Sequence, residues 1–350
     1  MKFIHIADVH LGANPEAGKA YQEKREQEIW DTFSRVIALC EEEKQDLLLI
    51  AGDLFHRQPL LRDLKEVNYL FSTLSHTKVV LIAGNHDYLK SNSQYRDFVW
   101  ADCVYPLFEE QIRGVVFKEA DVAVYGFSYH QKEMRQNKLQ GIRAPKHRTC
   151  EILLVHGGDE KHLPFSRDSL VDSGFTYVAL GHIHKAGQMV ENKAYYPGSL
   201  EPLDKNEIGD HGFIRGEMKD NGLTLSFVPF ACRKMIHAKV VVEDGDTNFA
   251  ISHRIKMAIE QQGVEHIYKI ILIGERAPEL DLNPEYFDVF GNVIEIADET
   301  IPTFDFAKLY EENKENLIGQ YIQSFGQPVV GSVEYQALYE GVRGLLESRT

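Results

Sequence analysis

The sequence from Phe3 to His10 reads FIHIADVH, an apolar run that ends at Asp8 and His10. Four later apolar runs also end beside Gly or another small residue and polar groups: DLLLIAGD, VVLIAGNHD, EILLVHGG and YVALGHIH. Short continuous runs of β-branched and aliphatic residues are typical of buried strands. The five runs therefore predict five buried strands, each followed by a loop that carries polar side chains.

Apolar residues recur at helical spacing between the first three runs. Residues 19–44 carry them at positions such as Ile29, Phe33 and Val36, and residues 64–74 repeat the pattern. The resulting order of strand, helix, strand, helix, strand predicts a layered α/β sheet. Ligands of such sheets bind outside the carboxyl ends of the strands. We therefore expect one site, assembled from five loops at the same end of one sheet.

From about Gly187 to Phe230 the sequence changes from continuous apolar runs to alternating segments. The segments GFIRGEMK and LTLSFVPF are joined through Asn221-Gly222, which predicts an antiparallel hairpin that closes the first domain. Beyond it, AKVVVEDGD, HIYKIILIGE and NVIEIADE predict three strands, and residues 247–262 predict a helix. These elements indicate a second, small α/β domain.

The last part of the chain has the pattern of amphipathic helices. From Thr303 onwards apolar residues recur at helical spacing, and we place Leu317 and Val333 on the apolar stripes. A length of 350 residues is enough for more than one domain. We therefore expect a main domain, a capping domain and a helical tail, over residues 1–235, 236–302 and 303–350.

Composition narrows the choice of compartment and partner. The longest apolar run, Leu47 to Ala51, is far too short to cross a membrane, and no apolar stretch before Asp8 resembles a signal peptide. Four cysteines lie far apart without CxxC spacing, which fits a reducing compartment. We expect a cytoplasmic protein. A net charge of −15 means that any polyanion must be bound by a local basic patch or by metal ions.

Side chains with metal-binding atoms follow all five runs. A single histidine of this kind is more often an ordinary core or loop residue, but carboxylate and amide oxygens mixed with imidazoles form a ligand set for divalent metals. Alternation along a strand sends residues two apart to the same face, so we expect His182 and His184 to share one cavity, as Asp8 and His10 do. The candidate ligands are Asp8, His10, Asp53, Asn85, His156, His182 and His184.

The number of candidate ligands indicates more than one ion. Seven ligands exceed the need of a single ion, whereas two ions about 3.5 to 4 Å apart that share a carboxylate would use all of them. Asp53 is the natural bridge. Nitrogen and oxygen ligands suit Mn²⁺, Fe²⁺ or Zn²⁺.

The ordered pieces D-x-H, G-D, G-N-H-D, H and G-H-x-H resemble the calcineurin-like metallophosphoesterase superfamily. The resemblance implies an α/β fold, a layered sandwich of mixed sheets flanked by helices, with a small α/β capping domain and a helical C-terminal tail. It makes His86 the counterpart of the family's catalytic histidine and Mn²⁺ the preferred ion. It also implies two metal sites that share Asp53, one with Asp8, His10 and His184 and one with Asn85, His156 and His182.

Within that superfamily, the segments AGDLFHRQP, GHIHK and YYPGSLEP resemble the SbcD-type DNA double-strand-break repair nucleases, including a bacterial branch called YhaO. The resemblance covers residues 1 to about 235. It implies a 3′ to 5′ exonuclease on duplex ends and an endonuclease on single strands. His56 matches a second active-site histidine that helps to orient DNA in part of that family, although its position also suits an ordinary exposed loop residue.

Basic residues near these motifs are the candidates for DNA contact. The segment KEMRQNKLQGIRAPKHR, residues 132–148, is the clearest local patch, although such runs are more often solvated loops. After residue 199 the sequence contains an acidic segment, LEPLDKNEIGDHGF, where the related nucleases usually have more basic sequences. The candidate DNA-binding residues are Arg57, Arg62, Lys132, Arg135, Lys138 and Arg143.

The resemblance also implies partners. The nuclease subunits of that family form homodimers and bind an SbcC-like coiled-coil ATPase through C-terminal helices. An amphipathic tail is compatible with docking into a partner groove, although amphipathic helices more commonly pack against their own protein. Two other functions stay open, a small-molecule phosphodiesterase acting on cyclic nucleotides and a non-catalytic DNA-end scaffold. The complete ligand set argues against the scaffold.

Overall fold

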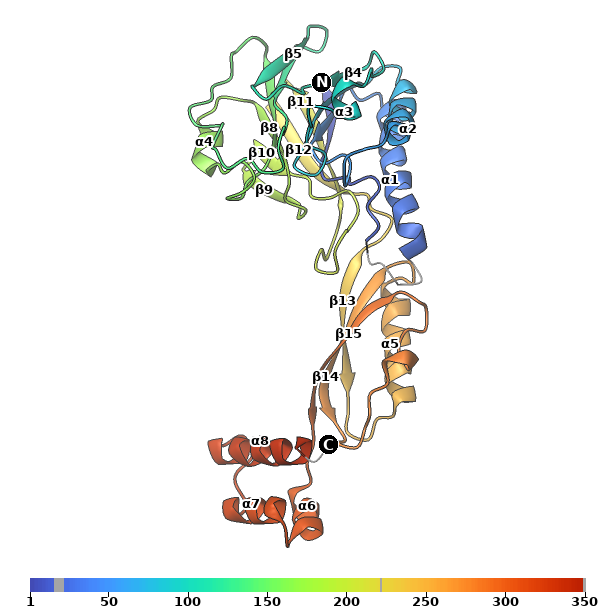
Figure 1. Ribbon diagram of the computed structural model, residues 1–350, viewed down its shortest axis with the longest axis vertical. Coiled ribbons are helices and arrows are strands. Elements are labelled where there is room, and N and C mark those ends of the chain that lie inside the picture. Colours follow the sequence, from blue (N-terminus) through green and yellow to red (C-terminus); the bar gives the residue numbers. More distant parts are fainter. Residues whose placement is uncertain (16–21, 221, 349–350) are drawn as a thin grey trace. The chain divides into compact units, whose positions relative to one another are not determined.

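The computed structural model describes residues 1–15, 22–220 and 222–348. The chain divides into two compact units (Figure 1). Unit 1 comprises Met1–Ile236 and Val264–Tyr268, and unit 2 comprises His237–Gly263 and Lys269–Thr350. Within the described ranges, no helix combines the length and the apolar character that crossing a membrane requires.

Two six-stranded sheets form unit 1. The first sheet has the order β12-β11-β1-β2-β3-β4, with β1 Lys2–Ile6, β2 Leu47–Ala51, β3 Lys78–Ile82, β4 Val104–Pro106, β11 Gly212–Lys219 and β12 Gly222–Pro229. The second sheet has the order β5-β6-β7-β8-β10-β9, with β5 Arg113–Phe117, β6 Val122–Gly126, β7 Cys150–His156, β8 Tyr177–Gly181, β9 Gly187–Val190 and β10 Ala194–Tyr196.

The prediction of a single sheet was therefore wrong. Of the five apolar runs, three form β1, β2 and β3 of the first sheet, and two form β7 and β8 of the second. The strands within each group are parallel. Every residue of β2, β7 and β8 is buried, so these strands are covered on both faces. A run that is apolar on both faces does not reveal which sheet it joins.

Alternating residues of β2 show how the layers pack. Leu47, Leu49 and Ala51 lie in the core between the two sheets. Leu48 and Ile50 face the other way, into a core that includes Phe33 of helix α1 (Gln22–Glu42) and Phe71 of helix α2 (Leu61–Ser72). Each fully buried aliphatic side chain contributes about 1.5 to 3 kcal/mol. The predicted helix start at residue 19 lies outside the described residues.

A third core covers the outer face of the second sheet, where Leu153, Val155 and Leu180 pack against Leu170 of the short helix α4 (Arg167–Val171). Another short helix, α3 (Gln94–Asp97), follows β3. The layering is therefore helices, sheet, sheet and a thinner outer cover, as expected of a layered sandwich of mixed sheets.

The predicted hairpin is present. β11 and β12 pair antiparallel from Gly212 with Pro229 to Lys219 with Gly222, and β11 also pairs antiparallel with β1. Asn221 of the predicted turn lies outside the described residues. The hairpin makes an otherwise parallel first sheet a mixed one.

The strands β13 (Met235–Val242), β14 (Ile267–Arg276) and β15 (Val293–Pro302) form a three-stranded sheet in that order. Helix α5 (Asn248–Gln262) buries Ile251, Ile255 and Ile259, and the 3-10 helix η1 (Pro284–Tyr286) follows β14. The three strands and the helix expected in this part of the chain are all present.

Three further helices complete unit 2: α6 (Phe306–Asn313), α7 (Leu317–Phe325) and α8 (Val333–Glu347). Their apolar stripes pack on one another around Ile318, Ile322, Leu338 and Val342.

Two of the residues assigned to the apolar stripes of the tail were placed wrongly. Leu317 is 63% exposed and Val333 is 81% exposed. Each is the first residue after a helix N-cap, Asn316 or Ser332. Helical side chains lean toward the N-terminus, so these two point beyond the end of the packed stripe.

Candidate metal centre

The seven candidate ligands lie in the loops that follow β1, β2, β3 and β8 and at the end of β7. The structure brings all seven together, in groups whose ligand atoms lie within a few ångströms of one another. Asp8, His10, Asp53, Asn85 and His156 are buried, whereas His182 and His184 are partly exposed. Residues from both sheets therefore contribute to one site.

Strand alternation does not explain how Asp8 and His10 come to share this site. β1 ends at Ile6, and both residues have a left-handed backbone, with φ of 50° and 53°. Asp53 has the same conformation, with φ of 49°. Left-handed conformations of residues other than glycine are costly and cluster at functional sites. The ligands are thus positioned by irregular loops and not by the pleat of a strand.

A first group of ligand atoms surrounds the Nε2 atom of His184. This atom lies 3.1 Å from His10 Nε2 and 4.0 Å from Asp8 Oδ1. His10 Nε2 in turn lies 3.7 Å from Asp53 Oδ2. The four residues expected to form the first metal site therefore adjoin one another.

A second group surrounds the Oδ1 atom of Asn85. It lies 2.9 Å from His156 Nε2 and 3.1 Å from His182 Nδ1. His156 Nε2 also lies 3.4 Å from Asp53 Oδ2. Asp53 Oδ2 is therefore the atom that adjoins both groups, which is the place of the expected bridging carboxylate.

His182 and His184 both lie at the one centre, as expected, but they contact different ligand groups. His182 contacts Asn85 in the second group, whereas His184 contacts His10 in the first. His182 has φ of 98°, so the chain turns between the two residues and does not continue as a strand. One short loop thereby serves both groups.

Glycines precede the ligands because there is no room for a side chain beside them. A Cβ atom on Gly84 would lie 2.2 Å from Asp53 Oδ1 and 2.7 Å from His156 Nε2. A Cβ atom on Gly181 would lie 2.0 Å from the carbonyl oxygen of Ala51. The G-N-H and G-H-x-H spacings therefore reflect the close approach of the two sheets at the site.

Burial and charge shape the protonation of the centre. Burial raises the pKa of Asp8 to about 6. Burial alone would lower the pKa of His156, but Asp53 and Asp8 raise it to about 9. Burial alone would also lower the pKa of His184, but Glu207 and Asp8 raise it to about 9. A buried centre with this much negative charge attracts cations, and a metal ion that binds here displaces protons from the imidazoles.

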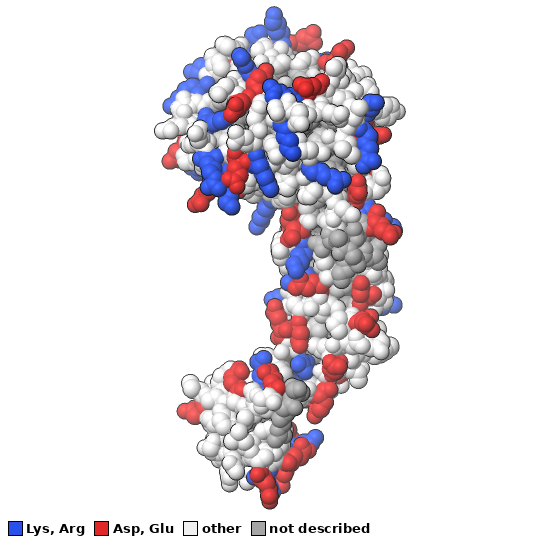
Figure 2. All heavy atoms as spheres, viewed as in Figure 1, with Lys and Arg blue, Asp and Glu red and all other residues white. Residues whose placement is uncertain are grey.

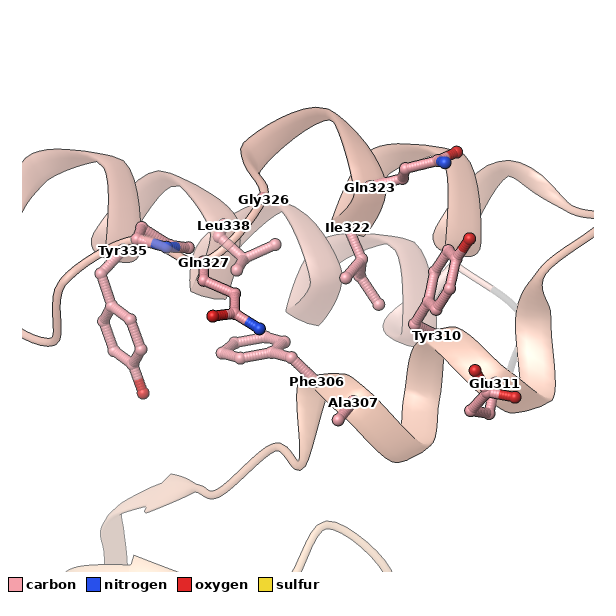
Figure 3. Close-up of a pocket in the computed structure, with 11 residues that line it drawn as sticks. Phe306, Ala307, Tyr310, Glu311, Ile322, Gln323, Gly326, Gln327, Tyr335 and Leu338 are labelled. Carbon is pink, nitrogen blue, oxygen red and sulfur yellow. The ribbon is translucent and has the colours of Figure 1, made fainter.

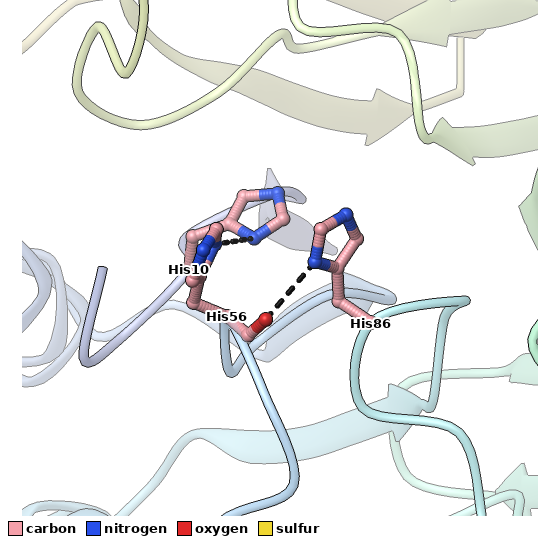
Figure 4. A group of neighbouring side chains, drawn as sticks. All are labelled: His10, His56 and His86. Carbon is pink, nitrogen blue, oxygen red and sulfur yellow. Dashed lines mark hydrogen bonds between the residues drawn. The ribbon is translucent and has the colours of Figure 1, made fainter. Parts of the chain in front are cut away.

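His86 and His56 lie beside the first group (Figure 4). The ring of His86 has its centre 4.7 Å from that of His10 and 5.2 Å from that of His56. His86 Nδ1 donates to the carbonyl oxygen of His56 over 2.9 Å, and its backbone N–H donates to Asp53 Oδ1. His56 Nδ1 lies 3.3 Å from His10 Nδ1. The structure therefore places both predicted histidines at the edge of the metal-binding groups.

Three carboxylates around the centre were not singled out from the sequence. Asp159 contacts His182, Glu207 contacts His184, and Asp87 accepts hydrogen bonds from the backbone of Gly84 and Phe55. Burial, followed by the nearby charge of Asp53, raises the pKa of Asp87 to about 7. Asp87 belongs to the G-N-H-D motif and could have been found there. The other two sit in loops without a recognisable pattern.

The candidate DNA-binding residues lie outside the ligand groups. Arg57 is exposed next to His56. Several of the others already have partners: Arg62 pairs with Asp63, Arg135 with Glu133, and Lys138 with Glu110. Arg143 donates to the carbonyl oxygen of Ile142, and Lys132 is exposed.

The segment that carries four of these basic residues is tied to the metal centre. The backbone N–H of Met134 donates to the carbonyl oxygen of Lys161, and that of Leu163 donates to Met134. Lys161 and Leu163 belong to the loop that also carries Asp159, the residue in contact with His182. Lys132 and Arg135 therefore flank a strand-like bridge to the edge of the site.

The donor atoms fit divalent metal ions. Asn85 Oδ1 faces two imidazole nitrogens, and His10 Nε2 faces His184 Nε2, so each group gathers nitrogen and oxygen atoms that can bind a metal ion. A divalent cation among these atoms would replace the protons of the imidazoles. Two nitrogens bound to one divalent ion at about 2.0 to 2.1 Å in tetrahedral geometry lie roughly 3.3 Å apart, close to the observed 3.1 Å between His10 and His184. Mixed oxygen and nitrogen ligands suit Mn²⁺, Fe²⁺ and Zn²⁺.

Comparison with known proteins also indicates a metallophosphoesterase. The chain is 28% identical to the metallophosphoesterase YhaO of Bacillus subtilis over 65% of its own length and 60% of that protein. It is 28% identical to the DNA double-strand break repair protein Mre11 of Methanocaldococcus jannaschii, over 69% of both chains. It is 30% identical to the Mre11 protein of Aeropyrum pernix, over 60% of its own length and 56% of that protein. The matches thus span between 56% and 69% of the length of these relatives.

Residues 1–186, more than half of the chain, match the family model described as calcineurin-like phosphoesterase. This region contains β1 to β8 and all seven candidate ligands. The chain therefore belongs to the calcineurin-like phosphoesterase family and is a metal-dependent hydrolase of phosphoester bonds.

Proposed function

We propose that the chain is a DNA repair nuclease that acts as a 3′ to 5′ exonuclease on duplex ends and as an endonuclease on single strands. The observation that carries the proposal is the pair of ligand groups that adjoin at Asp53, with His86 and His56 at their edge. Asp8, His10, Asp53 and His184 would hold one Mn²⁺ ion. Asp53, Asn85, His156 and His182 would hold the other.

The chain's own residues divide the work of phosphodiester cleavage. When bound, two divalent ions make hydroxide available near neutral pH and stabilise charge on the attacking and leaving oxygens. His86 keeps its Nδ1–H on the carbonyl oxygen of His56, which leaves Nε2 to contact a phosphate oxygen or to pass a proton to the leaving oxygen. His56, exposed on the outer side of this group, would orient the DNA strand.

DNA as the substrate is supported by two further observations. Two of the relatives described above are named as DNA double-strand break repair proteins. Lys and Arg side chains are spread over the visible face of unit 1, whereas acidic side chains dominate the visible face of unit 2 (Figure 2). Local basic residues such as Arg57, Lys132 and Arg135 would bind backbone phosphates despite the overall charge of −15.

Degradation of an end-labelled linear duplex by the purified protein with added Mn²⁺ tests the proposal. A parallel reaction contains bis-p-nitrophenyl phosphate, a small diester. We expect shortening of the duplex, and the ladder of products reports the polarity. Cleavage of the small diester with no action on duplex or single-stranded DNA would contradict the nuclease and favour the small-molecule phosphodiesterase. Absence of both activities would favour the scaffold.

We also propose that helices α6 to α8 bind the coiled-coil part of an SbcC-like ATPase. They form an open pocket of about 560 Å³ lined by Phe306, Tyr310, Ile322 and Leu338 among others (Figure 3). Val329 and Val330, beside this pocket in the sequence, are each 77% exposed. An apolar pocket that is followed in the chain by two exposed valines suits the apolar face of a partner helix.

Deletion of residues 303–350 is expected to abolish the complex with such an ATPase in size-exclusion chromatography. Because the deletion also removes helices that pack on the rest of unit 2, a double substitution of Val329 and Val330 by glutamate provides the milder test. We expect it to weaken binding at least tenfold while the circular dichroism spectrum stays unchanged. An intact complex after the deletion would refute the proposal.

We propose further that the protein forms a homodimer through the outer face of α2. Leu61 is 42% exposed and Tyr69, two turns further along the same face, is 68% exposed. Val99 is 85% exposed, and the segment that carries it is held beside α2 because Ala101 N–H donates to Asn68. Leu61 and Tyr69 on α2, and Val99 on the segment bound to it, are exposed apolar residues that a second copy would cover.

Light scattering of the purified protein is expected to give the mass of two chains. Replacing Leu61 and Tyr69 by glutamate is expected to give the mass of one chain, because two buried charges would oppose association. Replacement of the exposed Val289, which lies in unit 2, serves as the control. A wild-type protein that is monomeric at micromolar concentration would overturn the dimer.

A further inference from the structure

We propose that Asp159 and Glu207 are positioning residues, each of which fixes one histidine of the G-H-x-H loop in the tautomer that its metal ion requires. The inference rests on the proposed two-ion centre and adds to it two carboxylates from other loops. His182 and His184 are one residue apart, yet they use opposite ring nitrogens toward the ligand groups, Nδ1 and Nε2. A neighbouring group must therefore stabilise a different tautomer in each of the two rings.

Glu207 makes this selection for His184. Glu207 Oε1 lies 2.6 Å from His184 Nδ1. Since a carboxylate of this kind accepts, Nδ1 carries a proton, and Nε2 is the nitrogen left to bind a metal ion beside His10 and Asp8. Ring orientation and ligand basicity are both set by such an outer carboxylate. Glu207 therefore aims His184 into the first ligand group.

The loop between β10 and β11 holds Glu207 firmly. Its second oxygen, Oε2, accepts hydrogen bonds from Ser199 Oγ over 3.1 Å and from the backbone N–H of Leu203 over 2.9 Å. The side chain is only 18% exposed. Both carboxylate oxygens are thus in use, one by the loop and one by the metal-binding histidine.

Asp159 makes the opposite selection for His182. Asp159 Oδ2 lies 2.6 Å from His182 Nε2, so Nε2 carries the proton and Nδ1 faces Asn85. The backbone N–H groups of Lys161 and His162 donate to Asp159 Oδ1, and His162 Nδ1 also contacts the carboxylate. Asp159 therefore aims His182 into the second ligand group.

The two contacts differ in their exposure to water. The Asp159 side chain is 44% exposed, whereas that of Glu207 is 18% exposed. Water competes more effectively for the exposed pair. Loss of an outer-shell partner typically weakens metal binding about 10- to 100-fold. We expect Glu207→Ala to fall at the upper end of this range and Asp159→Ala at the lower end.

The test is Mn²⁺ binding by the full chain, followed through the paramagnetic resonance signal of free Mn²⁺ during titration. Wild type is expected to bind two ions. Glu207→Ala is expected to weaken one of them, while Glu207→Gln, which keeps an acceptor oxygen, loses less. Asp159→Ala is expected to weaken the other ion, so the variant that loses both carboxylates is weakened at both.

Double-mutant cycles assign each carboxylate to its histidine. Once His184 is replaced by alanine, Glu207→Ala should cause no further loss of Mn²⁺ affinity, and Asp159→Ala should behave in the same way with His182. Glu191→Ala is the matched control, because Glu191 is an exposed glutamate of unit 1 that lies outside the ligand groups, and it should leave the affinity for both ions unchanged. Thermal melts with a chelator present show whether a variant has lost stability instead of metal affinity.

Two outcomes would count against the inference, and they are distinct from failure of the proposed function. Wild-type affinity for both ions in Glu207→Ala and Asp159→Ala would overturn it, as would losses that simply add in the cycles. A wild-type chain that binds no Mn²⁺ would instead overturn the two-ion centre on which the proposed function depends.

Discussion

Asp53→Asn is expected to reduce hydrolysis of both DNA and bis-p-nitrophenyl phosphate by about 10³-fold or more, and to reduce bound Mn²⁺ from two ions to one or none. Asp53 Oδ2 is the atom that adjoins both ligand groups, 3.4 Å from His156 Nε2 and 3.7 Å from His10 Nε2. Asparagine keeps the shape but removes the charge. Metal ions supply several kcal/mol of transition-state stabilisation, and each 1.36 kcal/mol is a factor of ten in rate.

Metal analysis of the dialysed protein and steady-state rates measure the two effects of this substitution. Asp102→Asn is the matched control, because Asp102 is an exposed aspartate of unit 1 that lies outside the ligand groups. The control should retain two ions and wild-type rates. If Asp53→Asn retained two ions and at least a tenth of the activity, the bridging role would be refuted.

The sequence identifies the ligands better than it identifies the path that brings them together. Each ligand follows an apolar run. Positions such as Gly84 have no room for a side chain, so glycine recurs there and can be recognised in the sequence. The sequence does not show which run belongs to which sheet, because β2, β7 and β8 are buried on both faces. The left-handed backbone of Asp8 and His10 is also invisible to a rule based on strand alternation.

Outer carboxylates are harder still to predict. Glu207 lies 23 residues after His184 in a loop whose composition is simply acidic. Its role depends on a fold that returns this loop to the end of β8, and no local spacing encodes that return. Asp87, by contrast, is part of the G-N-H-D motif and ties two ligand loops together through Gly84 and Phe55. Local motifs thus reveal residues that act within their own loop, and not those that act across loops.

His86→Ala is expected to lower hydrolysis of duplex DNA and of the small diester by about 10²- to 10⁴-fold, the usual contribution of a general acid or base, while two Mn²⁺ ions stay bound. His86 lies beside the first group and donates its Nδ1–H to the carbonyl oxygen of His56; we assign it to proton transfer and not to either set of four ligands. His86→Ala is thus expected to lose activity but keep its metal ions, whereas Asp53→Asn is expected to lose both.

His56→Ala provides the internal comparison for this result. His56 is exposed and contacts His10 from the outside, so we expect its loss to slow duplex degradation while hydrolysis of the small diester changes little. His76→Ala, at a histidine whose side chain is 52% exposed and pairs with Asp46, should leave both rates unchanged. If His86→Ala lost metal along with activity, His86 would be a ligand and not an acid. If it kept full activity, the proton on the leaving oxygen would have to come from another group of the centre.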